Sequence, residues 1–100
     1  INHPALKIMI DTTAMGVAGE TLEEWFTAFE GNIVNTHFID GNPYGHLAWG
    51  DGTQPLQQWL EVLNKNNYSG LLGLEITARK YYRDPAAADL QNMKALSQFF

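Results

Sequence analysis

Three apolar runs in this chain each lead into a residue that can bind a metal ion or move a proton. Residues 6–10 precede Asp11, residues 33–36 precede His37, and residues 71–74 precede Glu75. Carboxylate oxygens and an imidazole nitrogen, without sulfur, suit Mn²⁺, Co²⁺, Mg²⁺ or Zn²⁺. A carboxylate beside such an ion could also take a proton from a carbon next to a carbonyl. The pattern therefore predicts a divalent-metal site in which Glu75 is both ligand and proton-transfer group.

Each of these residues also has an ordinary structural interpretation. Asp11 and Glu75 could cap the segments that follow them, and His37 could be a hydrogen-bonded core residue. A second histidine, His46, favours the metal site, because it follows His37 closely in a glycine-rich loop that can fold back over the strand ends. It could equally be an exposed loop residue. His3, which precedes a proline near the chain start, is expected to have no role.

The three residues meet only if the apolar runs are neighbouring parallel strands. Each run has the length and the β-branched or leucine-rich composition of a buried strand, and each is followed by a stretch typical of a helix. Strands that alternate with helices pair in parallel, and their carboxyl ends lie at one edge of the sheet. We therefore expect an α/β fold with strands near residues 6–10, 33–38 and 71–76.

Start signals and apolar spacing predict three helices. Thr21 and Glu24 form a capping box ahead of an aromatic stripe. Pro55 fits the first turn of a second helix, and Asp84 with Pro85 starts a third. The aromatic stripe of the first helix is Trp25, Phe26 and Phe29, and the expected inner face of the last helix is Leu90, Met93, Leu96 and Phe100. The loop at residues 40–54 is long and rich in Gly, Asn, Pro and Asp, which is typical of functional loops.

Composition excludes several classes of protein. With 100 residues, 45% hydrophobic and 17% charged, the chain has a globular composition and is expected to be at most one domain, a single partial domain over residues 1–100. It has no cysteine, which excludes thiolate ligands and fits a cytoplasmic location. No apolar run approaches the roughly 20 residues that span a bilayer, and the first residues do not have the pattern expected of a signal peptide. The net charge of −5 argues against nucleic-acid binding. The basic cluster of Arg79, Lys80 and Arg83 is either a solvated turn or an anion site.

Three parallel strands cannot close into a barrel. Both edges of such a sheet remain open, and a chain of this size leaves much apolar surface uncovered. We therefore expect the chain to be part of a larger barrel, associating with the missing barrel half, or to form a homo-oligomer.

Four motifs, taken in order and spacing, carry a family resemblance. They are Met9-Ile10-Asp11-Thr12, Thr36-His37-Phe38-Ile39-Asp40, His46 with Gly50-Asp51-Gly52, and Tyr68-Ser69-Gly70 leading to Leu74-Glu75. The pattern resembles the xylose isomerase-like superfamily of β/α barrels, which holds sugar phosphate isomerases and epimerases, ketose 3-epimerases and endonuclease IV enzymes. Its later motifs look most like the fructoselysine 3-epimerase branch. The resemblance implies that the chain is the C-terminal three β/α units of a TIM (β/α)8 barrel, incomplete in this chain.

The resemblance also implies roles. Asp11, His37 and Glu75 match three of four metal ligands, with Mn²⁺ the expected ion; the fourth is a glutamate of an earlier strand, outside this chain. Glu75 also matches one of two catalytic carboxylates. His46 falls where ketose epimerases carry a substrate-contacting arginine and endonuclease IV a zinc-binding histidine, so we assign it to substrate binding and leave ligation open. The implied activity is metal-dependent isomerisation or epimerisation of a ketose or sugar phosphate, with this chain inactive alone.

One position departs from the family pattern. Many members carry a histidine three residues after the first aspartate, where this chain has Ala14. A multi-zinc endonuclease would lose a ligand there, and the acidic charge balance also disfavours DNA. An endonuclease IV-like protein and a non-catalytic barrel remnant that acts as an assembly or binding module remain the alternatives.

Overall fold

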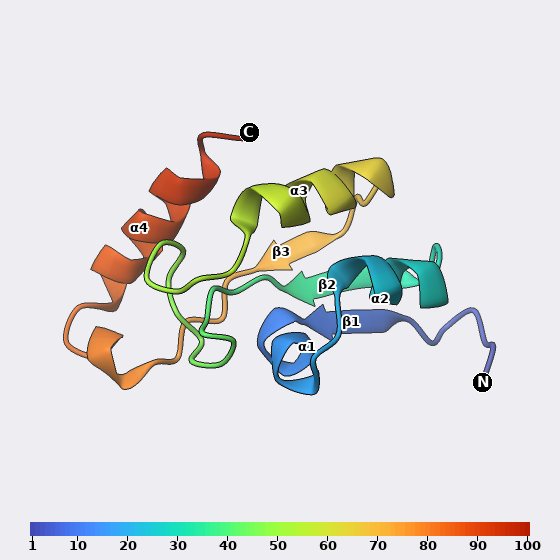
Figure 1. Cartoon of the computed structure of the whole chain (residues 1–100), viewed down its shortest axis with the longest axis horizontal. Coiled ribbons are helices and arrows are strands. Elements are labelled where there is room, and N and C mark those ends of the chain that lie inside the picture. Colours follow the sequence, from blue (N-terminus) through green and yellow to red (C-terminus); the bar gives the residue numbers. More distant parts are fainter.

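The computed structural model describes all 100 residues and has three parallel strands in one open sheet (Figure 1). Strand β1 (Ile8–Asp11) pairs with β2 (Ile33–His37), and β2 pairs with β3 (Leu71–Gly73). Parallel neighbours need crossover connections, and helices supply them between each pair of strands. The predicted α/β fold, with strands alternating with helices in an unclosed sheet, is confirmed.

The chain between β1 and β2 forms two short helices, α1 (Thr12–Ala18) and α2 (Leu22–Ala28). Gly19 ends α1 in the left-handed conformation, at a φ of 73°, where glycine is unstrained. Thr21 and Glu24 then make both bonds of the predicted capping box. The apolar spacing did not predict α1, which begins directly at the end of β1.

Two more helices complete the chain. Helix α3 (Leu56–Lys65) follows the long loop at residues 40–54, and a 3-10 turn, η1 (Arg79–Tyr81), precedes α4 (Pro85–Leu96). Asp84 caps α4 by accepting the N–H of Ala87, as its position before Pro85 predicted. None of the helices is long and apolar enough to cross a membrane.

The core lies between the sheet and the helices, and it includes part of the long loop. Phe38, Trp49 and Trp59 pack together with ring centroids 5.0 to 5.9 Å apart. The Trp49 indole also donates to the Phe38 carbonyl at 3.1 Å. The long loop is therefore anchored in the core through a buried tryptophan of its own.

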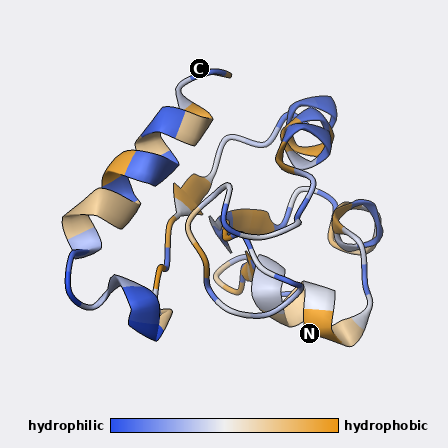
Figure 2. Cartoon of the chain, turned by 60° about the vertical axis from the view of Figure 1, so that its left-hand side comes forward, coloured by the Kyte–Doolittle hydropathy of each residue, from blue (hydrophilic) through white to orange (hydrophobic).

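The predicted inner face of α4 is wrong. Three of its four residues are exposed: Leu90 at 71%, Met93 at 60% and Phe100 at 81%. The buried positions are Ala88, Asn92 and Leu96. The reason is a polar contact. The Asn92 side chain accepts the backbone N–H of Trp49 at 2.7 Å, so the face of α4 that carries Asn92 packs against the core. Figure 2 shows hydrophobic and hydrophilic residues in alternating patches along α4, without one continuous apolar stripe.

The aromatic stripe of α2 and the bounds of all three strands also differ from the predictions; β2 ends at His37, one residue before the predicted end. Phe26 is buried, but Trp25 is only partly buried and Phe29 is exposed. Strand β1 includes Asp11 itself, and β3 ends at Gly73, so Glu75 lies two residues beyond its strand.

The two faces of the sheet have different surroundings. Ile10 and Thr36, which are register partners, are buried on the helix side. Met9 and its partner Asn35 point to the other face, where Met9 and Leu71 are exposed. By the same alternation Asp11 and His37 project from this uncovered face, at the carboxyl ends of their strands.

Candidate metal centre

Asp11 ends β1 and starts α1, and its two oxygens have different partners. Oδ1 accepts the N–H groups of Thr13 and Ala14, each at 2.9 Å, which caps the helix. Oδ2 faces the His37 ring, with 3.3 Å to Nδ1. Both interpretations of Asp11 are therefore met, because capping uses one oxygen and leaves the other available as a ligand.

His37 lies between the two carboxylates. It is the register partner of Asp11, and its Nδ1 is 3.3 Å from Asp11 Oδ2 and 3.3 Å from Glu75 Oε2. Gly73 is its partner in β3, and a Cβ there would lie 3.4 Å from the imidazole Cδ2 and 3.0 Å from the Thr36 carbonyl oxygen. The absence of a side chain at Gly73 leaves room for the ring. Asp11, His37 and Glu75 thus form one cluster of side chains, in which the Glu75 side chain is 41% exposed.

Thr12 joins the segment that carries Asp11 to the segment that carries His37. Its buried hydroxyl lies 3.1 Å from the His37 carbonyl oxygen and 2.9 Å from that of Ile39, and it accepts the Ile39 N–H at 2.9 Å. The residue next to Asp11 is thereby joined to the segment around His37. Sequence reasoning included Thr12 in a motif but gave it no role, because nothing local indicates a partner 25 residues away.

The long loop brings His46 to the same cluster. His46 Nδ1 is 3.2 Å from Glu75 Oε2, and its side chain is 28% exposed. Asp11, His46 and Glu75 each offer one ligand atom, and these atoms lie within 4.8 Å of one another. His46 has a φ of 47°, a left-handed conformation that costs a residue with a side chain about 1 kcal/mol. Contacts of the loop must therefore hold His46 in place.

The closest of these donors are as far apart as two ligands of one divalent cation, although the His37–Asp11 contact is also a hydrogen bond, as the structural interpretation of His37 predicted. Ligands about 2.1 Å from one ion and at adjacent positions lie roughly 3.0–3.4 Å apart, and the closest donor pairs here are 3.2 and 3.3 Å apart. His46 Nδ1 is buried and makes no hydrogen bond, although Glu75 Oε2 is near. A buried ring nitrogen without a hydrogen bond is rare, and a cation shared with the carboxylate would give it a partner. The cluster could therefore bind a metal ion.

The far end of the long loop is fastened to η1 by Asp51. Lys80 Nζ is 2.8 Å from Asp51 Oδ2, and the Tyr81 hydroxyl donates to the same oxygen while accepting the Ala48 N–H at 2.9 Å. Lys80 first, and then Tyr81, lower the pKa of Asp51 from 3.8 to about 2. Burial, followed by the bond to Asp51, raises the pKa of Tyr81. Lys80 thus forms an ion pair, and the anion-site interpretation of Arg79, Lys80 and Arg83 loses one of its three cations.

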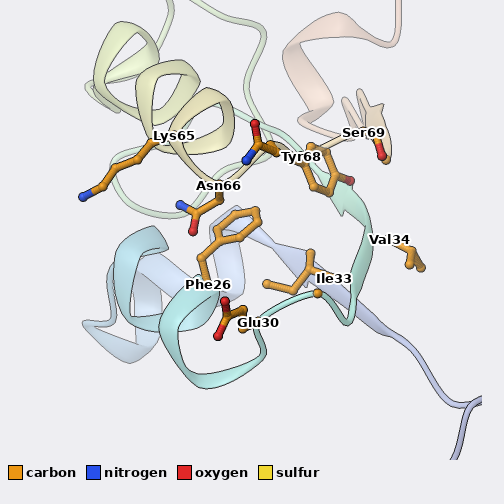
Figure 3. Close-up of a pocket in the computed structure, with 11 residues that line it drawn as sticks. Phe26, Glu30, Ile33, Val34, Lys65, Asn66, Tyr68 and Ser69 are labelled. Carbon is orange, nitrogen blue, oxygen red and sulfur yellow. The ribbon is translucent and has the colours of Figure 1, made fainter.

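A cavity of about 500 Å³ lies at the opposite ends of the strands (Figure 3). Its lining comes from the ends of α2 and α3 and from the residues around the starts of β2 and β3. The rings of Phe26 and Tyr68, which both line it, pack edge to face with centroids 5.8 Å apart. None of the four clustered side chains borders this cavity. In barrels of alternating strands and helices the chemistry occurs at the carboxyl ends of the strands, so the cluster is the candidate centre.

The sequence was compared with known proteins. The model of a family described as xylose isomerase-like TIM barrel matches residues 1–98. No curated protein and no solved structure gives a significant match. The family includes metal-dependent sugar isomerases and epimerases as well as endonuclease IV. The match covers the whole sheet and all four residues of the cluster.

Proposed function

The chain belongs to the xylose isomerase-like TIM barrel family. From this premise we propose that it is part of a metal-dependent isomerase or epimerase of sugars or sugar phosphates. The observation that carries the proposal is the convergence of Asp11, His37, His46 and Glu75 at the carboxyl ends of the strands. Two carboxylates and two imidazoles form a donor set without sulfur, which suits Mn²⁺ and also Co²⁺, Mg²⁺ or Zn²⁺. We propose Mn²⁺ as the ion, and the ketose 3-epimerases as the nearest branch.

Each residue has a defined task in this proposal. Asp11, His37 and Glu75 would hold the ion, and His46 would either join them or contact the substrate. A bound divalent ion polarises a carbonyl and makes the neighbouring C–H more acidic. Glu75 directs Oε2 at the two histidines, which leaves Oε1 for the substrate. Oε1 can take the proton from the carbon next to the carbonyl, so that Glu75 becomes neutral, and then return it.

The place of proton return decides the product. Return of the proton to the former carbonyl carbon, with an O–H proton passing between the two adjacent oxygens, gives isomerisation. Epimerisation instead needs a second carboxylate that delivers a proton to the opposite face of the carbon that lost one. Asp11, the other carboxylate of the cluster, caps α1 through Oδ1 and is assigned to the ion through Oδ2, so it is not free for this task. We propose that a glutamate of another strand supplies it and the fourth predicted ligand, which makes this chain the C-terminal three units of the barrel.

Hydrogen exchange at the substrate tests this function. The 100-residue chain is incubated with Mn²⁺ and a ketose in heavy water, and deuterium at the carbons next to the carbonyl is followed by NMR. We expect slow exchange, above that of the Glu75→Gln variant and of the metal-free chain, with configuration retained and no net isomerisation or epimerisation, because the chain supplies one carboxylate on one face and is expected to be inactive in the complete reaction. Equal exchange by the chain and the variant would contradict the role of Glu75. Robust epimerisation by the chain alone would refute the need for a second carboxylate from elsewhere.

The uncovered sheet face supports a second candidate, a barrel remnant that acts as an assembly module. Met9 and Leu71 are exposed on that face, and β1 and β3 are both edge strands. Light scattering after size exclusion separates the candidates: a stable oligomer without Mn²⁺ binding favours assembly alone, and a metal-binding monomer rejects it. The nuclease alternative has less support, because Ala14 offers no ligand side chain beside Asp11.

A further inference from the structure

The carboxylate of Asp40 is buried and is satisfied by backbone N–H groups. The residue is 2% exposed, and no lysine or arginine forms an ion pair with it. Oδ1 accepts the N–H groups of Gly41 at 2.8 Å and Gln54 at 3.0 Å, and Oδ2 accepts those of Gly50 at 2.9 Å and Gly52 at 2.8 Å. Four such bonds stabilise a buried negative charge, and all four come from the loop that carries His46.

The backbone of Asp40 holds the same loop at a second place. Its N–H donates to the Leu47 carbonyl at 3.2 Å, and its carbonyl accepts the Leu47 N–H at 2.9 Å, which makes an isolated antiparallel bridge. Leu47 is the neighbour of His46, and Asp40 is three residues after His37. Asp40 therefore links the segments that carry the two histidines.

The fit between loop and carboxylate is close. A Cβ added to Gly52 would lie 2.3 Å from Asp40 Oδ1 and 2.6 Å from the Gly41 nitrogen. Such distances are far below van der Waals contact, so only glycine lets the loop backbone approach the carboxylate here. His46 meanwhile has a left-handed backbone that its residue type does not favour. Local preference thus opposes the path of the loop at His46, so long-range contacts must hold it, and those of Asp40 act beside the anchors at Trp49 and Asp51.

We propose that Asp40 is a positioning residue of the metal centre, which folds residues 41–54 over the strand ends and sets His46 within ligand range of Asp11 and Glu75. The proposal rests on the metal centre proposed above. Asp40→Asn tests it with little change in shape. An asparagine has a single acceptor oxygen, and its NH₂ group would face two N–H donors, so one pair of loop bonds is lost.

Pulsed EPR of bound Cu²⁺ counts the coordinated imidazoles and so reads the position of His46. We expect two coupled imidazoles in the chain, one in His46→Ala, and one in Asp40→Asn at full occupancy. Mn²⁺ affinity of Asp40→Asn should fall roughly 10–100-fold, as it does when a group that orients a ligand is removed. Asp84→Ala is the matched control, because it removes the cap of α4, away from the cluster, and should keep two imidazoles. Two imidazoles and unchanged Mn²⁺ affinity in Asp40→Asn would overturn the proposal.

Amide hydrogen exchange of the metal-free chain separates failure of this proposal from failure of the metal centre. Asp40→Asn should lose protection at Leu47, Gly50 and Gly52 while β1 to β3 stay protected, and preserved loop protection would overturn the positioning role. A chain that binds neither Cu²⁺ nor Mn²⁺ would refute the metal centre, and the exchange result would still decide whether Asp40 shapes the loop. If Asp40→Asn fails to fold, Gly52→Ala keeps the carboxylate, displaces the loop from it, and should give the same loss of protection and of one imidazole.

Discussion

Substitution of Asp11 can separate its two structural contributions. Oδ1 caps α1 with two 2.9 Å bonds, and Oδ2 points at the His37 ring from 3.3 Å. Alanine removes both functions, whereas asparagine keeps an oxygen that can cap the helix and loses the charged ligand. Asparagine and aspartate are about equally good N-caps, and replacing either by alanine typically costs about 1 kcal/mol.

The expected magnitudes follow from these contacts. Asp11→Ala should lower the free energy of unfolding of the metal-free chain by about 1 kcal/mol, which moves the urea midpoint by roughly 0.5–1 M. Asp11→Asn should change it by only a few tenths of a kcal/mol, because the lost attraction to the helix dipole is offset by relief of repulsion from Glu75. Both variants lose a charged ligand. Their Mn²⁺ affinity should therefore fall by more than the roughly 10–100-fold that loss of an orienting group causes.

Two measurements check the prediction. Tryptophan fluorescence in urea with EDTA gives the stability of the metal-free chain, and isothermal titration with Mn²⁺ gives the affinity. Thr21→Ala is the matched control, because Thr21 caps α2 through Glu24 and has no contact with the cluster. It should lower stability as Asp11→Ala does and leave the affinity unchanged. Mn²⁺ binding by Asp11→Asn at the affinity of the original chain would refute the ligand role, and a stability loss equal to that of Asp11→Ala would refute the separation.

Three further substitutions test other parts of the structure. Asp51→Asn should destabilise the chain at neutral pH. Since the folded pKa of Asp51 is lowered from 3.8 to about 2, its stability difference from the original chain should be constant above about pH 5, shrink as the pH falls, and be lost as the pH falls through about 2; a difference as large at about pH 2 as at neutral pH would contradict the bond to Lys80. Thr12→Val leaves a buried N–H without its acceptor and should cost about 1–3 kcal/mol in urea unfolding, so an unchanged midpoint would show that the hydroxyl bridge is unimportant. Leu96→Ala, at a buried position, should lower the free energy of unfolding by about 2–4 kcal/mol. Leu90→Gln, at an exposed position of the same helix, should change it by less than about 0.5 kcal/mol; equal losses would place Leu90 in the core.

The strand ends could be predicted from the sequence because strand geometry is local and repetitive. An apolar run of four or five residues predicts a strand, although one face of these strands is exposed here, and parallel pairing brings the following residues to one edge. Asp11, His37 and Glu75 needed only this rule to be expected together. Helix starts at Thr21 and Asp84 were equally predictable, since a cap bonds to a backbone group three residues away. The sequence by itself thus determined the fold class and led to the expectation that Asp11, His37 and Glu75 lie together; His46 was expected at the same site only because its loop is able to fold back over the strand ends.

Only the tertiary structure decided where the loop and the last helix go. Residues 40–54 have no periodicity, so the approach of His46 to Glu75 depends on the buried Asp40 carboxylate and on Trp49 in the core. The orientation of α4 was likewise set by Asn92, whose bond to Trp49 outweighs the exposure of Leu90. These contacts join residues ten to forty-three positions apart, where neither spacing nor propensity carries information. Local rules place the strand ends, and long-range polar contacts complete the site.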